Sequence, residues 1–448
     1  MTSRMPPLGL RAGVDGTVQV VLGTFEGRQA VVARTASDRR RGALARRDGD
    51  SLAAAARTAL QLRLPLVLEL SSSGADVSEG IDSLHGWGAA AAAVAACSGM
   101  VPVLAVATGP VISGPALLLG LADLVVMTPA AVAFVSGPSM VEAFTGVRLG
   151  LEALGGAAVH ATSSGLCAVE SDDPAGTVAE LLTYLPDHAD QEAPLLATAD
   201  PPDRPVPELR EVVPARDSAS YDIREVVAAV ADDGMSSELW TRWAPQLVTV
   251  MARLGGRSVG IVANQPRALA GTLDIAASQK GARFVRFCDA FNLPIVTLVD
   301  TPGFLPGKDL EWRGMIRHGA ELAFAYAEAT VPRLCLILRK AFGGAYIVMD
   351  SKGLGNDLCL AWPGAEIAVM GAPGAVQILH RRADPDQRPQ LEDDYRRRFL
   401  TPWPAAERGF VDGVIDPGDT RAVLASSLAI LATKRELLSG RKHDGGPL

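Results

Sequence analysis

The residues Gly343-Gly344-Ala345 form the pattern in this sequence with the clearest chemical use. They follow a run of β-forming residues, 334–338, and precede a predicted helix. Glycines allow a tight turn and bring backbone N–H groups close to a ligand. The first N–H groups of a helix have no partner inside it, so an oxyanion is stabilised beside them. The pattern predicts an anion-binding turn, although many ordinary strand-to-helix turns share it.

Familiar catalytic motifs are absent from the sequence. It contains no G-x-S-x-G, H-E-x-x-H, Walker A or G-x-G-x-x-G motif, and its six histidines lack metal-ligand spacing. We expect His318 to be structural rather than a general base, and we expect no bound metal. Acid, base or nucleophile catalysis by a familiar constellation of side chains is therefore unsupported.

An alternation of strands and helices has to position this turn. The second half predicts strands at 258–263, 295–299 and 334–338 and helices at 276–291 and 310–329. The first half predicts a hairpin with its turn at Glu26-Gly27, strands at 64–70 and 101–107, and a helix at 80–98. Strands that alternate with helices indicate parallel sheets covered by helices.

Two segments of the chain resemble each other. Residues 111–138 and 341–373 both run from a small-residue turn through a helix, a strand and a Pro turn into another strand. Such an internal repeat is what a duplicated domain leaves. Residues 187–217 are rich in Pro, Asp and Glu and read as a linker, so we expect domains at 1–217 and 218–448.

The composition excludes several classes of function. The formal net charge is −8, which gives no electrostatic case for nucleic-acid binding. The five cysteines are scattered without a C-x-x-C pair, which argues against a zinc ribbon and for a reducing compartment. Residues 86–122 carry no charge, but prolines and glycines divide them into lengths too short to span a membrane. With no signal peptide recognised, we expect a cytoplasmic protein without a membrane segment.

Long ordered segments resemble the carboxyltransferase (β) subunits of biotin-dependent acyl-CoA carboxylases, of the acetyl-CoA and propionyl-CoA carboxylase type. Examples are GARFVRFCDAFNLPIVTLVDTPGFLPG (281–307) and AWPGAEIAVMGAPGAVQIL (361–379). The resemblance is nearly continuous from residue 221 to 448, and residues before 217 match in outline only. It implies an α/β fold with two crotonase-like (ββα spiral) domains related by internal duplication, the N-terminal one on the acyl-CoA side and the C-terminal one on the biotin side.

The resemblance also implies a reaction and partners. In that family carboxybiotin releases CO2 in the site, the biotin ureido nitrogen removes the α-proton of a CoA thioester, and the enolate captures CO2. The sequence has no Met-Lys-Met biotinylation motif, so biotin would arrive on a biotin carboxyl carrier protein, loaded by a biotin carboxylase. The family places its active site across a dimer, so we expect a homo- or hetero-oligomer, with a hexamer as one form.

In the C-terminal half, the resemblance assigns Gly344 and Ala345 as the N–H donors that face the biotin ureido oxygen. It places Gly343, Tyr346 and Ile347 at the substrate pocket. The biotin-side loop is expected at Thr301, Pro302, Gly303 and Phe304. Propionyl-type relatives carry an acidic residue at the position of Ile347, so an apolar residue favours acetyl-CoA or an unusual acyl group. The alternative is that Ile347 is merely a buried helix residue.

In the N-terminal half, the resemblance assigns Ser113 and Gly114 as the donors for the thioester oxygen. The next residue is Pro115, which has no N–H. The acyl-CoA turn is expected at Gly74, Ala75 and Asp76. Asp76 stands where the family has an arginine, which reverses the charge beside an anionic substrate unless a basic neighbour, for which Arg39, Arg40 and Arg41 are candidates, compensates.

Two alternatives remain open at this point. The chain could be a divergent relative that uses a non-standard acceptor in specialised metabolism, or a biotin-dependent decarboxylase. It could also be a non-catalytic structural partner of a standard β subunit. Loss of activity with simple acyl-CoAs would favour the first, and co-purification with a second carboxyltransferase would favour the last.

Overall fold

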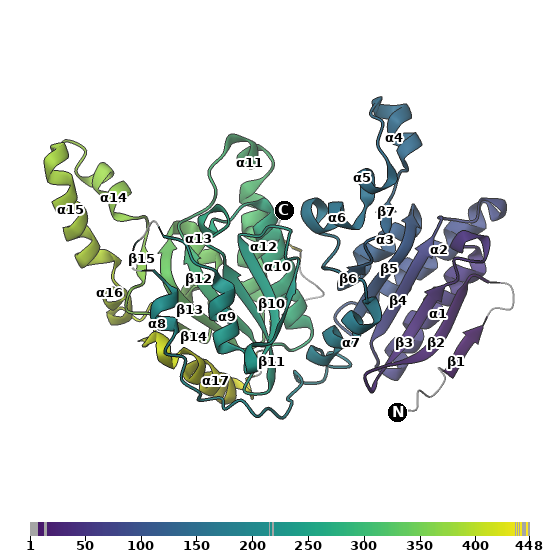
Figure 1. Cartoon of the computed structure of the whole chain (residues 1–448), viewed down its shortest axis with the longest axis horizontal. Helices are drawn as coiled ribbons and strands as arrows, with labels where there is room; N and C mark the ends of the chain where they lie inside the picture. The colour runs from purple at the N-terminus through teal and green to yellow at the C-terminus, as the bar shows by residue number, and fades with distance from the viewer. Residues whose placement is uncertain are drawn as a thin grey trace. The chain divides into compact units, whose positions relative to one another are not determined.

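The chain is divided into two compact units. The computed structural model describes residues 8–12, 16–214, 216, 219–434, 436, 438, 440 and 445–446 (Figure 1). Unit 1 comprises Met1–Glu192 with Trp240–Trp243, and unit 2 comprises Ala193–Leu239 with Ala244–Leu448. The boundary expected near residue 217 lies outside the described residues, so the division into 1–217 and 218–448 stays a prediction.

Unit 1 contains one eight-stranded sheet in the order β1-β2-β3-β4-β5-β6-β8, with β7 paired to β5. Its first three strands are antiparallel, and the pairings from β3 onward are parallel. The strands are β1 (Leu8–Ala12), β2 (Val18–Phe25), β3 (Arg28–Thr35), β4 (Leu66–Ser72), β5 (Val103–Ile112), β6 (Leu124–Met127), β7 (Val132–Phe134) and β8 (Val169–Glu170).

The β2–β3 hairpin confirms the predicted turn. Glu26 and Gly27 both have positive φ, at 45° and 89°, which is the backbone conformation of a two-residue turn between antiparallel strands. Cross-strand pairing runs in register from Phe25 and Arg28 to Val18 and Thr35.

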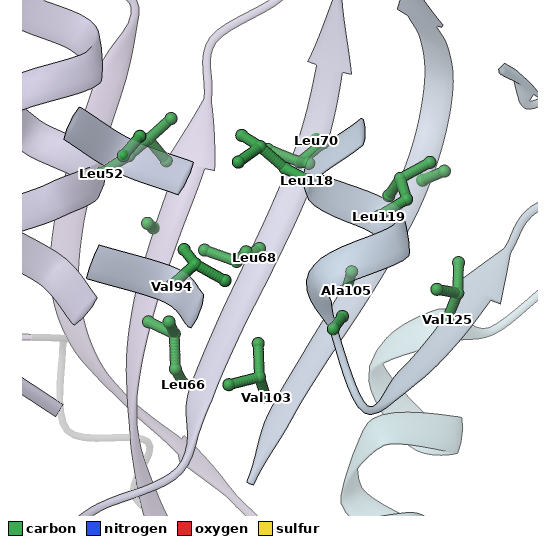
Figure 2. Packing of buried hydrophobic residues seen from close by; sticks show 14 of the residues in the cluster. Leu52, Leu66, Leu68, Leu70, Val94, Val103, Ala105, Leu118, Leu119 and Val125 are labelled. Atoms are coloured by element: carbon green, nitrogen blue, oxygen red, sulfur yellow. The ribbon is translucent and has the colours of Figure 1, made fainter. Parts of the chain in front are cut away.

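Helices of unit 1 cover the parallel strands and enclose its core. Figure 2 shows Val94 of α2 beside Leu68 of β4 and Leu118 of α3 beside Leu70, and Leu52 of α1 belongs to the same buried cluster. α1 and α2 come close together at Gly49, where an added Cβ would lie 2.2 Å from the backbone of Gly86. The helices are α1 (Arg46–Leu62), α2 (Ile81–Ala95), α3 (Gly114–Leu121), α4 (Pro138–Thr145), α5 (Leu151–Gly155), α6 (Ala157–Val159) and α7 (Pro174–Tyr184), with short turns η1 (Arg40–Gly42), η2 (Val77–Glu79) and η3 (His160–Ser164).

Unit 2 repeats the same sheet topology. Its strands are ordered β16-β14-β13-β12-β11-β10-β9, with β15 paired to β13. β9, β10 and β11 pair antiparallel, and the pairings from β11 onward are parallel, as in unit 1. The strands are β9 (Ser236–Leu239), β10 (Leu247–Leu254), β11 (Arg257–Asn264), β12 (Ile295–Thr301), β13 (Arg333–Phe342), β14 (Leu358–Ala361), β15 (Glu366–Ala368) and β16 (Gly413–Val414). The predicted α/β class is confirmed, and the repeated topology fits an internal duplication.

One of the two helix ranges predicted for unit 2, 276–291, is confirmed by α10 (Ile275–Ala290) within one residue at each end. One predicted helix, 310–329, is wrong as a single element: it is divided into α11 (Lys308–Trp312) and α12 (Met315–Glu328) because Gly314 has φ +95°. The other helices are α8 (Leu209–Val212), α9 (Ile223–Val230), α13 (Gly343–Val348), α14 (Ala372–Leu379), α15 (Arg388–Tyr395), α16 (Pro402–Glu407) and α17 (Thr420–Leu431), with short turns η4 (Asp232–Gly234), η5 (Leu269–Gly271), η6 (Lys352–Leu354), η7 (Pro385–Gln387), η8 (Arg396–Leu400) and η9 (Pro417–Asp419). Among the described residues, no helix is long and apolar enough to cross a membrane.

Candidate functional site

In unit 2, the predicted biotin-side loop and the Gly-Gly-Ala turn lie side by side. Thr301 at the end of β12 pairs with Ala341 near the end of β13, so both segments leave the sheet at the same edge. A Cβ added at Gly344 would lie 3.6 Å from Cε2 of Phe304, and one at Gly319 of α12 would lie 3.3 Å from Cζ of the same ring. The Phe304 ring therefore packs between the turn and α12.

The backbone at Gly343 favours glycine. Its φ is +61°, and an added Cβ would lie 3.1 Å from the carbonyl oxygen of Val369. Residues with a side chain rarely adopt this conformation. Gly303 in the neighbouring loop also has a positive φ, +145°, with open space where a Cβ would be. Neither glycine adds a side chain beside the turn.

The backbone donors of the turn remain available to a ligand. In the described part of the chain, neither the Gly344 N–H nor the Ala345 N–H donates to a loop or turn carbonyl. Both belong to the first turn of α13, where N–H groups have no partner inside the helix. The methyl group of Ala345 is fully buried, which fixes the turn against the core.

A buried ion pair supports this edge of the sheet. The Arg339 Nε lies 3.0 Å from Oδ2 of Asp300, and the N–H of Lys340 donates to Oδ1 of Asp300 at 3.1 Å. Burial raises the pKa of Asp300, and the nearby Arg339 guanidinium opposes that shift. Because Asp300 precedes the biotin-side loop and Lys340 precedes the Gly-Gly-Ala turn, these contacts hold the two segments in a fixed relation.

The two residues after Ala345 differ in their surroundings. Tyr346 is nearly buried, with its hydroxyl 4.0 Å from the sulfur of Cys359, and burial raises the pKa of that hydroxyl. Its ring belongs to the core, and a role in substrate binding stays a prediction. Ile347 has 46% of its surface exposed, so the alternative that it is merely buried is wrong.

Unit 1 has an equivalent turn after β5. Ser113 has φ +63° and ψ −130°, a conformation that favours glycine, and its φ matches that of Gly343 within a few degrees. The Ser113 N–H donates to the carbonyl oxygen of Phe134 at 2.9 Å, so it already has a partner. The Gly114 carbonyl accepts from Nε1 of Trp87 at 2.7 Å, and a Cβ added at Gly114 would lie 3.2 Å from the indole.

The predicted acyl-CoA turn lies beside Ser113. A Cβ added at Gly74, which has φ +112°, would lie 3.5 Å from the Ile112 carbonyl oxygen and 3.8 Å from Cβ of Ser113. Ala75 forms an isolated parallel bridge with Leu44, as Phe304 does with Leu273 in unit 2. The structure therefore brings together the predicted residues of the N-terminal half.

Asp76 is neutralised by a neighbour. Its Oδ2 accepts from Nη1 of Arg40 at 2.8 Å, and its Oδ1 accepts from the N–H and hydroxyl of Ser78 at 3.0 and 2.6 Å. These hydrogen bonds from Ser78, together with Arg40, lower the pKa of Asp76. The sequence suggested a compensating arginine among 39–41, and the structure identifies Arg40.

Some contacts at the two turns were not foreseen from the sequence. The Phe134 carbonyl and the Trp87 indole lie next to the unit 1 turn, and no motif marked either residue.

His318 is nearly buried, with Nδ1 2.9 Å from Oε1 of Glu321, which agrees with a structural role. No group of three or more His, Cys, Asp or Glu among the described residues could hold a metal ion.

The geometry supports charge stabilisation rather than acid–base catalysis by a side chain. Each unit presents a strand-to-helix turn bordered by a glycine-containing loop at the carboxyl edge of its parallel strands. Backbone donors held in this way can stabilise an oxyanion without rearrangement. Two such turns could serve a reaction in which negative charge develops on two different molecules.

Comparisons with known proteins identify relatives along nearly the whole chain. A family model described as the carboxyl transferase domain matches residues 3–445. The chain is 45% identical over 398 residues to the methylmalonyl-CoA carboxyltransferase 12S subunit of Propionibacterium freudenreichii subsp. shermanii, covering 87% of this chain and 76% of that protein. It is 45% identical over 400 residues to the propionyl-CoA carboxylase carboxyltransferase subunit of Haloferax mediterranei, covering 87% and 78%.

A decarboxylase subunit and a solved structure are also similar. The methylmalonyl-CoA decarboxylase subunit alpha of Veillonella parvula is 43% identical over 396 residues, covering 88% of this chain and 77% of that protein. A crystal structure of transcarboxylase 12S, a hexamer with methylmalonyl-coenzyme A and methylmalonic acid bound, has a TM-score of 0.94 at 42% identity and covers 98% of this chain and 86% of that chain. This likeness confirms the expected two-domain crotonase-like fold.

Proposed function

The chain belongs to the carboxyl transferase domain family and is an enzyme of the acyl-CoA carboxyltransferase class, and from this premise we propose that it moves a carboxyl group from carboxybiotin on a separate carrier protein to the α-carbon of an acyl-CoA thioester. The observation that carries this proposal is the pair of equivalent turns, Ser113-Gly114 and Gly343-Gly344-Ala345, in two units of the same topology. One turn serves the oxyanion of each substrate.

The unit 2 turn is the proposed biotin side. The Gly344 and Ala345 N–H groups would hold the ureido oxygen, and the loop Thr301, Pro302, Gly303 and Phe304 would border the ring system. Carboxybiotin supplies the carboxyl group and, after its loss, the base for the α-proton. The chain contributes position and charge stabilisation, and each preorganised donor of this kind is worth about 2.7–4 kcal/mol in the transition state.

The unit 1 turn is the proposed thioester side. Gly114 is its main donor, because the Ser113 N–H is held by the Phe134 carbonyl and would have to be shared. Gly74, Ala75 and Asp76 border the same turn, with the charge of Asp76 taken up by Arg40. An enolate oxygen placed there would receive fewer backbone hydrogen bonds than the biotin oxygen in unit 2.

The reaction requires partners that deliver biotin. We infer a biotin carboxylase and a biotin carboxyl carrier protein, because the chain has no biotinylation motif of its own. We further propose that the thioester side of one copy meets the biotin side of another in a dimer-based oligomer, with a hexamer as in the related transcarboxylase 12S.

The acyl acceptor is proposed from Ile347 and its surroundings. Its half-exposed apolar side chain follows the biotin-side turn and would favour a short acyl group such as acetyl. The relatives are named for propionyl-CoA and methylmalonyl-CoA, so propionyl-CoA is the acceptor to compare with acetyl-CoA.

The reverse half-reaction tests this function on the purified chain. Malonyl-CoA and methylmalonyl-CoA would each be incubated with biocytin, and mass spectrometry would follow the acyl-CoA product. We expect biocytin-dependent loss of the carboxyl group. No turnover with either substrate, beside an active relative assayed in parallel, would contradict the proposal and leave a non-standard acceptor or a non-catalytic role.

A biotin-dependent decarboxylase is the second candidate, and the likeness to the methylmalonyl-CoA decarboxylase subunit alpha favours it. Both candidates use the same two turns and differ in the direction of transfer. Isolation of the native complex separates them, because a biotin carboxylase accompanies a carboxylase and would be absent from a decarboxylase.

A further inference from the structure

A fully buried ion pair lies at the far end of the helix that begins with the Gly-Gly-Ala turn. α13 ends at Val348, and two residues later Asp350 has a positive φ, +58°, which ends the helical backbone. The Asp350 carboxylate accepts from Nη1 of Arg333, the first residue of β13. Arg333 is 2% exposed and Asp350 is completely buried. The segment that follows α13 is therefore joined to the start of the strand that precedes the helix.

Further contacts hold both partners of this pair. Nη2 of Arg333 donates to the carbonyl oxygens of Leu354 and Gly355, at 3.1 and 2.8 Å. The Thr297 hydroxyl of β12 donates to Oδ2 of Asp350 at 3.5 Å. The chain after α13 is therefore bound to two neighbouring strands of the sheet.

Unit 1 has uncharged residues at the corresponding place. β5 and β13 both contain ten residues, and each strand leads directly into its turn. The residues of unit 1 at the corresponding positions are apolar or small: Val103 for Arg333, Leu68 for Thr297 and Gly120 for Asp350. In unit 1 the helix α3 continues through Gly120 to Leu121, whereas α13 ends before Asp350. The ion pair is therefore a feature of unit 2 and not of the repeated topology.

A buried ion pair is a costly way to join these segments. Removing two charges from water costs free energy that their attraction often does not recover, so apolar residues in the same place are commonly as stable. Three buried polar atoms in and next to the pair, Nε of Arg333, Oγ of Ser351 and Oδ1 of Asn356, have no hydrogen-bond partner among the described residues. Because unit 1 keeps the same sheet topology with uncharged residues, the pair has a role other than forming the sheet.

The pair fixes the helix that carries the donors of the biotin-side turn. α13 has six residues and is about 9 Å long, so a shift of its end moves its first turn, which contains Gly344 and Ala345. We propose that Arg333 and Asp350 are positioning residues of the biotin-side turn: their ion pair fixes the far end of α13 and thereby keeps the two donor N–H groups directed at the bound oxyanion. This inference rests on the proposed function and adds to it the residues that hold one of its two turns.

A double variant, Arg333→Met/Asp350→Leu, removes the pair without leaving one charge unpaired. It should unfold thermally near the unchanged protein, since apolar residues often replace a buried ion pair without loss of stability. In the biocytin-dependent half-reaction we expect kcat to fall about tenfold or more, because a small displacement of a positioned group lowers the rate strongly. KM for the CoA thioester should stay within about twofold, because the proposed thioester turn belongs to unit 1.

The pH profile separates positioning from a general loss of structure. Burial raises the pKa of Asp350 to about 6, and the Arg333 guanidinium opposes that shift. The pair is therefore complete above pH 6 and is lost as the pH falls through 6, so kcat of the unchanged protein should decrease there and the double variant should lack this decrease. Burial raises the pKa of the nearby Tyr326 and Tyr346, so both stay protonated in this range. The other titratable groups around Asp350 are Cys335, Cys359 and Asp357.

Hydrogen exchange followed by mass spectrometry tests the positioning without requiring turnover. Asp350→Asn, which keeps the shape of the side chain and removes its charge, should make the peptide that covers α13 exchange about tenfold faster. Asp232→Asn is the matched control, because it makes the same change in another buried pair of unit 2, with Arg421, and should leave this peptide unchanged.

Two results would overturn the proposal. One is equal exchange of the α13 peptide in Asp350→Asn and Asp232→Asn, and the other is a kcat of the double variant within about twofold of the unchanged protein. Faster exchange of that peptide in a chain without carboxyl transfer would instead uphold the positioning and contradict only the proposed function.

Discussion

Replacing Pro115 by alanine should raise turnover, because it adds a backbone N–H to a turn that has one donor fewer than its equivalent. Pro115 follows Gly114 as Ala345 follows Gly344, and the two turns begin with nearly equal φ, +63° and +61°. The unit 2 turn offers two N–H groups that no loop or turn carbonyl of the described residues accepts. Proline has no N–H, so it withholds the second donor in unit 1.

The expected magnitude follows from the value of one oxyanion donor. Removing such a donor typically costs about a hundredfold to a thousandfold in kcat. We therefore expect Pro115→Ala to increase kcat for a CoA thioester by at least about tenfold and by at most about a thousandfold. The variant should also lose about 0.4–1 kcal/mol of stability, because proline restricts the unfolded chain.

The assay is the biocytin-dependent half-reaction, with two companion variants. Ala345→Pro removes the donor on the biotin side and should lower kcat about a hundredfold or more. The equivalent turn of unit 1 already accommodates proline at this position, so the substitution should leave the fold intact. Pro174→Ala, at the start of α7, is the matched control for the loss of a helix-initiating proline. Turnover of Pro115→Ala within about twofold of that control would refute the reasoning.

Three further predictions concern stability, pH and specificity. Gly343→Ala should destabilise unit 2 by about 1–2 kcal/mol and lower activity, because alanine disfavours φ +61° and its Cβ would lie close to the Val369 carbonyl. Thermal unfolding measures the loss of stability, and the half-reaction measures the loss of activity. Lys280, buried with Nζ 3.5 Å from the Ala244 carbonyl, has its pKa lowered to about 7, chiefly by desolvation. The folded chain therefore holds this proton less tightly than the unfolded chain, so the free energy of unfolding should rise between pH 7 and pH 10 by on the order of 4 kcal/mol. Lys280→Met should remove that rise when unfolding in urea is measured across this pH range. An equal dependence of the unfolding free energy on pH in both proteins would contradict the prediction. Ile347→Asp should shift the ratio of kcat/KM from acetyl-CoA toward propionyl-CoA, and an unchanged ratio would show that this half-exposed side chain does not face the acyl group.

The elements that position the site could be predicted from local sequence. The Glu26-Gly27 turn, the strand before Gly343 and the repeat of residues 111–138 in 341–373 all depend on short-range patterns. Glycine is predictable at these turns because few other residues adopt the backbone conformation of a tight turn. The division of the helix at Gly314 was missed, since an isolated glycine inside an apolar period often remains helical.

The contacts that decide the chemistry could not be predicted in the same way. The ion pair between Arg40 and Asp76 joins residues 36 positions apart and depends on the left-handed backbone of an arginine, which no propensity favours. The bond from the Ser113 N–H to the Phe134 carbonyl arises from the pairing of β5 with β7, which sequence periodicity does not reveal. Both contacts can be identified only from the folded structure, which brings the distant segments together.

The most direct test of the central claim is carboxyl exchange between two thioesters. Methylmalonyl-CoA with an isotopically labelled free carboxyl group would be mixed with unlabelled acetyl-CoA and the purified chain, with and without biocytin. The proposed function predicts labelled malonyl-CoA only when biocytin is present, and less of it with Ala345→Pro. Label transfer that is independent of biocytin, or none beside an active relative, would contradict the account.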